Sequence, residues 1–101
     1  PGCDLQGVDL SGKDLRNADL SNANLAEANL SGANLTGANL SGANLSKANL
    51  DRTNLSRSDL SGSFLFFSNI QKAYLFETNF SESFWVDGRK CSSHSKGSCE
   101  Y

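Results

Sequence analysis

The residues best suited to chemistry are three cysteines and one histidine, and most of them lie near the C-terminus. Cys91, His94 and Cys99 follow one another closely, whereas Cys3 lies at the other end. Two neighbouring cysteines can form a disulfide in an oxidising compartment, and together with a histidine they offer three of the four ligands of a structural zinc site. The spacing matches no usual zinc finger and a fourth ligand is missing. We therefore favour a Cys91–Cys99 disulfide over a metal site, and we expect no cofactor.

The remaining polar side chains lack the arrangements that catalysis needs. The carboxylates occur singly along the chain, whereas glycosidases and aspartic proteases require two neighbouring acids. The single histidine, in the tail, leaves no serine or cysteine triad. The glycines recur at a fixed spacing and form no phosphate-binding loop. We therefore expect that the protein is not an enzyme.

The charge balance argues against two further classes of partner. Nine Lys and Arg against eleven Asp and Glu give a formal net charge of -2. A nucleic-acid-binding protein would show a basic patch, and a mimic of nucleic acid would show an acidic excess. No apolar run is long enough to span a membrane. The sequence thus predicts neither nucleic-acid binding nor a membrane span.

A five-residue repeat occupies most of the chain and must position these side chains. Residues 23–50 read ANLAE, ANLSG, ANLTG, ANLSG, ANLSK and ANL, and an apolar residue stands at every fifth position from Leu5 to Trp85. A period of five is neither the 3.6 of a helix nor the 2 of a strand. So short a repeat predicts a solenoid, in which each unit packs on its neighbours.

Features that change every twenty residues indicate four units per coil. The residue before the central leucine is aspartate at Asp4, Asp9, Asp14 and Asp19, and it is asparagine from Asn24 onwards. With a coil of twenty residues, aspartate never lies on aspartate, and we expect the stacked amides to bond to one another. The same register places Glu27 beside Lys47, and Arg57 beside Glu77.

The repeat resembles that of the pentapeptide repeat family, whose units have a small residue, Asp or Asn, a central Leu or Phe, and two small or polar residues. The match extends over residues 3–87. The resemblance implies an all-β fold, a right-handed quadrilateral parallel β-helix of about four coils, in which each unit forms one side. We expect a β-helix over residues 1–87 and a C-terminal capping tail over residues 88–101.

The first and third positions of each unit are expected to point inward. The first is alanine from Ala18 to Ala48 and, except for Ala73, serine or threonine afterwards. Backbone carbonyls are the expected partners of these hydroxyl groups. Phe80 and Trp85 are larger than leucine and are expected to plug the end of the core.

Six further aromatic residues are expected to point outward from the last coil and to form an interaction patch: Phe64, Phe66, Phe67, Tyr74, Phe76 and Phe84. An apolar cluster on a polar surface requires a cover. The tail is our first choice, a second copy of the chain the next and a foreign protein the last. Because short solenoids commonly hide an open end by pairing, we also consider a homodimer through a coil end.

These observations predict a non-enzymatic structural or protein-interaction module with an unknown protein partner, whose contact surface is the aromatic C-terminal coil. The resemblance also brings an alternative, a DNA-mimic topoisomerase-binding protein of the quinolone-resistance type, although Lys47, Arg52 and Arg57 interrupt the acidic columns that mimicry requires. Ice binding would need stacked threonines, which the chain lacks. Similarity to members from the cyanobacterial and plant thylakoid lumen, including the chloroplast, implies that compartment or another oxidising one such as the periplasm.

Overall fold

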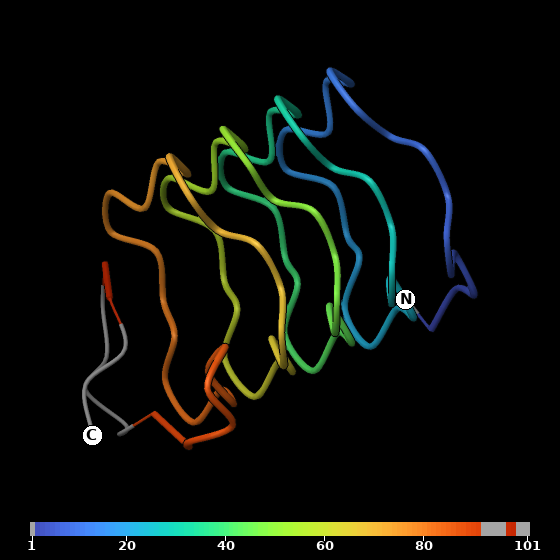
Figure 1. The fold of residues 1–101 in the computed structure, drawn as a ribbon. Coiled ribbons are helices and arrows are strands. Elements are labelled where there is room, and N and C mark those ends of the chain that lie inside the picture. Colours follow the sequence, from blue (N-terminus) through green and yellow to red (C-terminus); the bar gives the residue numbers. More distant parts are fainter. Residues whose placement is uncertain (1, 92–96, 99–101) are drawn as a thin grey trace.

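The computed structural model describes residues 2–91 and 97–98, and within these ranges the backbone forms no helix. From Asp4 and Asn24 to Phe64 and Phe84, each residue at the second position of a unit pairs in parallel with the residue twenty further on. These bridges are isolated, so no strand among the described residues is longer than one bridge. The backbone thus returns to the same place every twenty residues, and the turns of the chain stack (Figure 1). The predicted register is confirmed.

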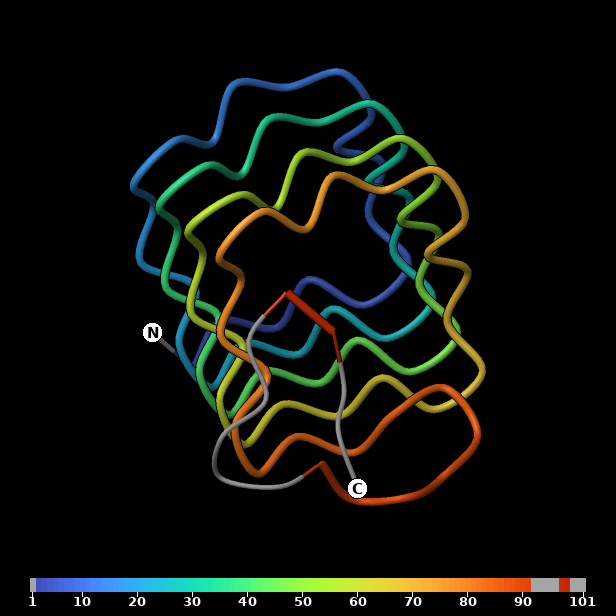
Figure 2. The same ribbon diagram turned by 90° about the vertical axis from the view of Figure 1, so that its left-hand side faces the viewer.

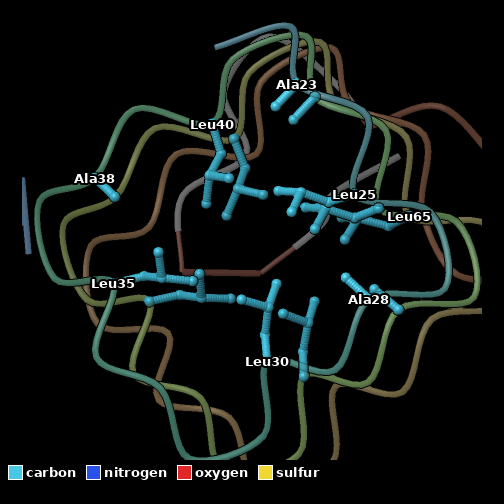
Figure 3. Close-up of a cluster of buried hydrophobic side chains, with 14 of the residues drawn as sticks. Ala23, Leu25, Ala28, Leu30, Leu35, Ala38, Leu40 and Leu65 are labelled. Carbon is cyan, nitrogen blue, oxygen red and sulfur yellow. The ribbon is translucent and has the colours of Figure 1, made fainter. Parts of the chain in front are cut away.

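Four sides make up each coil. Leu25, Leu30, Leu35 and Leu40 approach the axis from four directions, and Leu25 faces Leu35 across it (Figure 3). Leu65 lies on the same side as Leu25, two coils further along. Viewed along the stack, the coils superimpose around one axis (Figure 2). Units ten residues apart therefore lie on opposite sides.

Every backbone amide is satisfied in an inner unit that carries aspartate or asparagine at its second position, as residues 24–28 illustrate. The N–H of Asn24 donates to the preceding coil over 2.7 Å, and those of Leu25 and Glu27 donate to the following coil over 2.7 and 2.9 Å. The N–H of Ala28 closes the turn on Leu25 O over 3.0 Å. The N–H of Ala26 donates to Asn24 Oδ1 over 3.1 Å. A unit thus needs only one side-chain acceptor to complete its hydrogen bonds.

The side chain at the second position supplies that acceptor. Aspartate does this as well as asparagine, since Asp9 Oδ1 accepts the N–H of Ser11 over 3.0 Å. Our expectation of an amide ladder was wrong: within residues 2–91 and 97–98 no asparagine side chain bonds to another. The contacts along the stack are Asn24 to Asp4 and Asn79 to Asp59, both at 3.4 Å. The side-chain oxygen accepts the backbone N–H of its own turn because that N–H has no other acceptor within reach.

The fifth position of each unit lies at a corner with positive φ. From Gly2 to Glu82, φ at this position is between 55° and 71°. The hydrogen bond from the next residue back to the central residue makes each corner a β-turn of the type II pattern, which requires positive φ at its third residue. Glycine adopts this conformation without cost, as at Gly32, whereas another residue loses roughly 1 to 2 kcal/mol.

The interior is filled as predicted. The central leucines from Leu25 to Leu65 are fully buried, together with the first-position alanines from Ala23 to Ala48. Thr53 Oγ1 donates to Leu30 O over 2.6 Å, and Ser58 Oγ donates to Leu55 O over 2.7 Å. Every buried side-chain nitrogen and oxygen atom in the described part of the chain has a partner. Backbone carbonyls are thus the partners of the inward hydroxyl groups.

The C-terminal end of the stack is closed by aromatic side chains and by the chain beyond them. Phe80 is 1% exposed, and its ring meets the ring of Trp85 edge-on with centroids 4.9 Å apart. The chain then reverses through residues 86–89, and the N–H of Cys91 donates to Ser83 O over 2.7 Å. The N–H of Gly97 donates to Thr78 O over 2.7 Å, and residues 97–98 lie across the end of the coil (Figure 2).

Candidate functional site

Three phenylalanines form a ring cluster on the side of the stack that contains Leu65. Phe64 and Phe84 occupy the second position of units one coil apart, and their rings stack with centroids 5.2 Å apart and planes 5° apart. Phe66 lies against both rings, with centroid distances of 6.1 and 5.7 Å. We call Phe64, Phe66 and Phe84 the aromatic ladder.

The aromatic ladder replaces the side chain that completes the turn. One coil earlier, Asn44 Oδ1 accepts the N–H of Ser46 over 3.0 Å. Phe64 and Phe66 occupy the equivalent positions, and a phenylalanine offers no acceptor. A hydrogen bond of this kind contributes about 0.5 to 1.5 kcal/mol. The ladder therefore gives up a hydrogen bond that asparagine would provide at the same place, and the stacking of its partly buried rings, about 0.5 to 1.5 kcal/mol for a pair, offsets this loss.

Phe67, next to the ladder, departs furthest from the preferences of its residue type. It occupies a corner position with φ of 58°, a conformation that is unfavourable for a bulky residue. Its side chain is also 77% exposed, so burial does not offset this cost. Neither backbone conformation nor core packing explains a phenylalanine here. Nine other non-glycine corner residues share this positive φ, so the exposed ring is what distinguishes Phe67 from them.

Tyr74 and Phe76 lie on the opposite side of the stack. Tyr74 pairs with Asn54, in the column of units that contains Leu35, and is half a coil from Phe64. The two side chains are 61% and 62% exposed. The six aromatic residues thus do not form one patch, as we had expected, but two surfaces on opposite sides.

One cation lies over the Tyr74 and Phe76 surface. The guanidinium of Arg57 is 5.5 Å from the centroid of the Phe76 ring, and its Nε is 3.2 Å from Glu77 Oε1. The predicted pairing of Arg57 with Glu77 is confirmed. The predicted Glu27–Lys47 pair is not formed, since Glu27 Oε1 instead accepts a hydrogen bond from Gln6 Nε2 over 3.3 Å. Phe76 is therefore partly screened by Arg57, whereas no cation covers Phe67 within the described chain.

The described part of the tail covers only a little of these surfaces. Lys90 Nζ lies 5.7 Å from the centroid of the Phe84 ring and 3.6 Å from Glu82 Oε2. Phe67, Tyr74 and Phe76 are exposed. Residues 92–96 and 99–101 of the tail lie outside the described part, so the tail as their cover stays a prediction. At Cys91 and Gly97, the described part of the tail is bonded to the end of the stack.

Charged groups elsewhere are engaged in local turns. Hydrogen bonds from Ser11, Arg16 and Ser21 lower the pKa values of the three carboxyl groups that accept them below their ordinary value; these belong to Asp9, Asp14 and Asp19. Arg16 is held by Asp14 at 2.8 Å, which raises the pKa of the guanidinium. These aspartates thus act as turn acceptors, and no pair of them shares a proton.

The predicted tail site lies largely outside the described residues. Cys91 is buried, and Ser83 Oγ donates to its Sγ over 3.3 Å. His94 and Cys99 are outside the described part, so the Cys91–Cys99 disulfide stays a prediction. Within residues 2–91 and 97–98, no group of three or more His, Cys, Asp or Glu side chains could hold a metal ion. No helix in the same ranges has the length and apolar character needed to cross a membrane.

The repeat, its stacking and its turn acceptors define a pentapeptide solenoid. The sequence matches the description of pentapeptide repeats in eight copies, over residues 2–37, 28–65 and 43–81. The chain belongs to the pentapeptide repeat family. No sequence among curated proteins is significantly similar to it.

Several solved structures of this family are similar to the chain. A protein of the Arabidopsis thaliana thylakoid lumen is 34% identical over 83% of this chain and 62% of its own, with a TM-score of 0.44. HetL, involved in heterocyst differentiation regulation in the cyanobacterium Nostoc, is 33% identical over 86% of this chain and 42% of its own, with a TM-score of 0.42. Another Nostoc pentapeptide repeat protein is 36% identical over 82% and 64%, with a TM-score of 0.48. The chain spans less than two thirds of the length of these proteins.

Proposed function

We propose that this protein is a non-enzymatic interaction module that binds another protein through the outward aromatic residues of its last coil. The scaffold is the right-handed quadrilateral β-helix of its family over residues 1–87, and residues 88–101 act as a capping tail. The single observation that carries the proposal is Phe67, which is 77% exposed and in a backbone conformation that opposes its residue type. Exposed aromatic side chains are the usual centres of protein interfaces.

A triple substitution of Phe66, Phe67 and Phe76 by serine tests the proposal. Wild-type protein and variant are immobilised under oxidising conditions and exposed to an extract of the native compartment, and the bound proteins are quantified by mass spectrometry. A matched control carries Gln6→Ser and Asn22→Ser, which change exposed residues of the first coils. We expect binding to be lost in the triple variant and kept in the control. Unchanged self-association and unchanged partner contacts in a folded triple variant would refute the proposal.

The alternative of a DNA-mimic topoisomerase-binding protein has less support. Mimicry of a duplex depends on a sustained negative potential. Lys47, Arg52 and Arg57 are exposed on the middle coils, and Lys72 follows on the next. A gyrase supercoiling assay distinguishes the two, because a mimic inhibits the enzyme and an interaction module of another kind leaves it unchanged.

We further propose that the protein works in an oxidising compartment, the thylakoid lumen or the periplasm, where Cys91 and Cys99 form a disulfide. The buried position of Cys91 at the end of the core supports this, because a bridge there would fix the tail over the end. A bridge closing so short a loop contributes roughly 2 to 3 kcal/mol on chain-entropy arithmetic. Mass measurement after alkylation, with and without reductant, detects the bridge, and full alkylation without reductant would exclude it.

A further inference from the structure

We infer that the partner of the aromatic ladder and Phe67 is a second copy of this chain, which packs on the same side about a two-fold axis through Phe67. This inference rests on the proposed function and names its partner. The two copies run antiparallel, so that each presents the same residues to the other, as an isologous interface requires. This interface lies on the side of the stack, and Trp85, Cys91 and Gly97 already lie at its C-terminal end. A dimer through a coil end stays a separate prediction.

The charges along the corner that contains Phe67 reverse about that residue. The N–H of Phe67 donates to Val86 O over 3.1 Å, which keeps the twenty-residue register and places Asp87 one coil after Phe67. Lys47 holds the same position one coil before it. A two-fold axis through Phe67 therefore brings Lys47 opposite the partner copy's Asp87, and Asp87 opposite the partner copy's Lys47. Such self-complementary charge is typical of an interface between identical chains.

Existing ion pairs do not prevent this arrangement. Asp87 Oδ2 lies 3.2 Å from Arg89 Nε, and these side chains are 41% and 67% exposed. An exposed pair contributes only about 0 to 1 kcal/mol, so a weaker contact with Arg89 in the dimer costs little. Lys47 is exposed and forms no ion pair with Glu27, whose carboxylate bonds to Gln6.

The side next to this corner carries the aromatic ladder. Its outer rows carry small and polar side chains before the aromatic residues begin, with Asn44 and Ser46 one coil below Phe64 and Phe66. The ladder rings lie against one another, and Phe64 is 36% exposed. Phe67 at the corner stands beside this rigid group, so it adds contact area with few degrees of freedom to lose on binding.

Sedimentation equilibrium of the full chain tests the dimer with one substitution and one matched control. Phe67→Gly removes the aromatic ring and relieves the positive φ, so this variant is expected to unfold at higher urea concentration and yet to dissociate at least about tenfold more readily. Lys72→Gly relieves the same φ, 61°, at the next corner and is expected to dimerise like the wild type. A Phe67→Gly chain that dimerises as well as the wild type would overturn the inference.

A charge exchange tests the two-fold arrangement itself. Lys47→Glu and Asp87→Lys are each expected to be monomeric, because like charges then face each other twice across the axis. Mixing the two variants restores both opposite-charge contacts, so heterodimers should form. Single variants that dimerise, or a mixture that stays monomeric, would contradict this geometry.

The outcomes separate this inference from the proposed function. A wild-type chain that stays monomeric at high concentration under oxidising conditions overturns the dimer. Capture of a foreign protein that is lost in the serine triple variant would then still support the interaction module. If the triple variant keeps both self-association and binding of foreign proteins, the dimer and the interaction module are both overturned.

Discussion

The hydroxyl group of Thr53 donates to the carbonyl oxygen of Leu30, 2.6 Å away in the preceding coil. Thr78 bonds to Leu55 O in the same way at 2.6 Å, whereas Ser58 bonds to Leu55 O within its own turn at 2.7 Å. Threonine therefore links two coils through the interior, and serine reinforces a single turn.

Thr53→Val should lower the free energy of unfolding by about 1 to 2 kcal/mol, because valine keeps the shape and removes a buried donor. Urea unfolding measures the loss. Ser58→Ala is the comparison: Leu55 O keeps the N–H of Ser58 and the hydroxyl of Thr78 as donors, so a smaller loss is expected. Equal stability of Thr53→Val and the wild type would show that the link between coils contributes nothing.

Asn44→Ala should destabilise the protein by about 1 kcal/mol, because the N–H of Ser46 loses its acceptor. Asn44→Asp keeps a side-chain oxygen at the same place and is expected to stay within about 0.5 kcal/mol of the wild type at neutral pH. Thermal unfolding of both variants provides the measurement. If aspartate costs as much as alanine, the amide nitrogen and not the oxygen is the important group.

Acid should destabilise the first coil through its aspartates. The pKa values of Asp9, Asp14 and Asp19 lie below 3.8 in the folded protein, chiefly because side chains donate hydrogen bonds to their carboxylates. A folded pKa below the unfolded one means that the stabilisation is complete above 3.8 and is lost as the pH falls through the folded pKa. Replacing all three by asparagine keeps the acceptors and removes the titration. The unfolding midpoint of this variant should fall less between neutral pH and a pH below 3.8; an identical acid profile would contradict the assignment.

Phe80→Ala should cost about 3 to 5 kcal/mol, because the ring is buried against Trp85 at the end of the core. Phe76→Ala removes a ring of the same size that is 62% exposed, so only the contact with Arg57, about 0.5 to 1 kcal/mol, is lost. Tryptophan fluorescence and urea unfolding follow both variants. Comparable losses would mean that Phe76 contributes to folding and not to binding.

The register of the coil could be predicted from the sequence because a strict five-residue period fixes which residues lie one coil apart. The pairing of Asn24 with Asn44 and the Arg57–Glu77 ion pair both follow from counting twenty residues. The same count places Tyr74 half a coil from Phe64, so the separation of the aromatic residues into two surfaces was available from the sequence and was missed.

Two features could not be read from the period. A repeat shows where a turn occurs but not its dihedral angles, so the positive φ of Phe67 required the structure. Whether the side-chain nitrogen of an asparagine also reaches an acceptor in the neighbouring coil depends on distances of a few tenths of an ångström. Asn24 makes both contacts at once: its Oδ1 accepts the N–H of Ala26 over 3.1 Å, and its Nδ2 donates to Asp4 Oδ1 over 3.4 Å.

The hydrogen bonds between main-chain groups of successive coils make the length of the stack adjustable. Since Leu25 and Asn44 meet through main-chain groups, any twenty consecutive inner residues form an interchangeable block. Duplicating residues 26–45 would insert one more coil and leave the sides of the following coils in their original orientation. Inserting five residues would instead rotate all following coils by one side. Where Phe67 must stay aligned with Lys47, insertions by gene duplication are therefore limited to multiples of one coil.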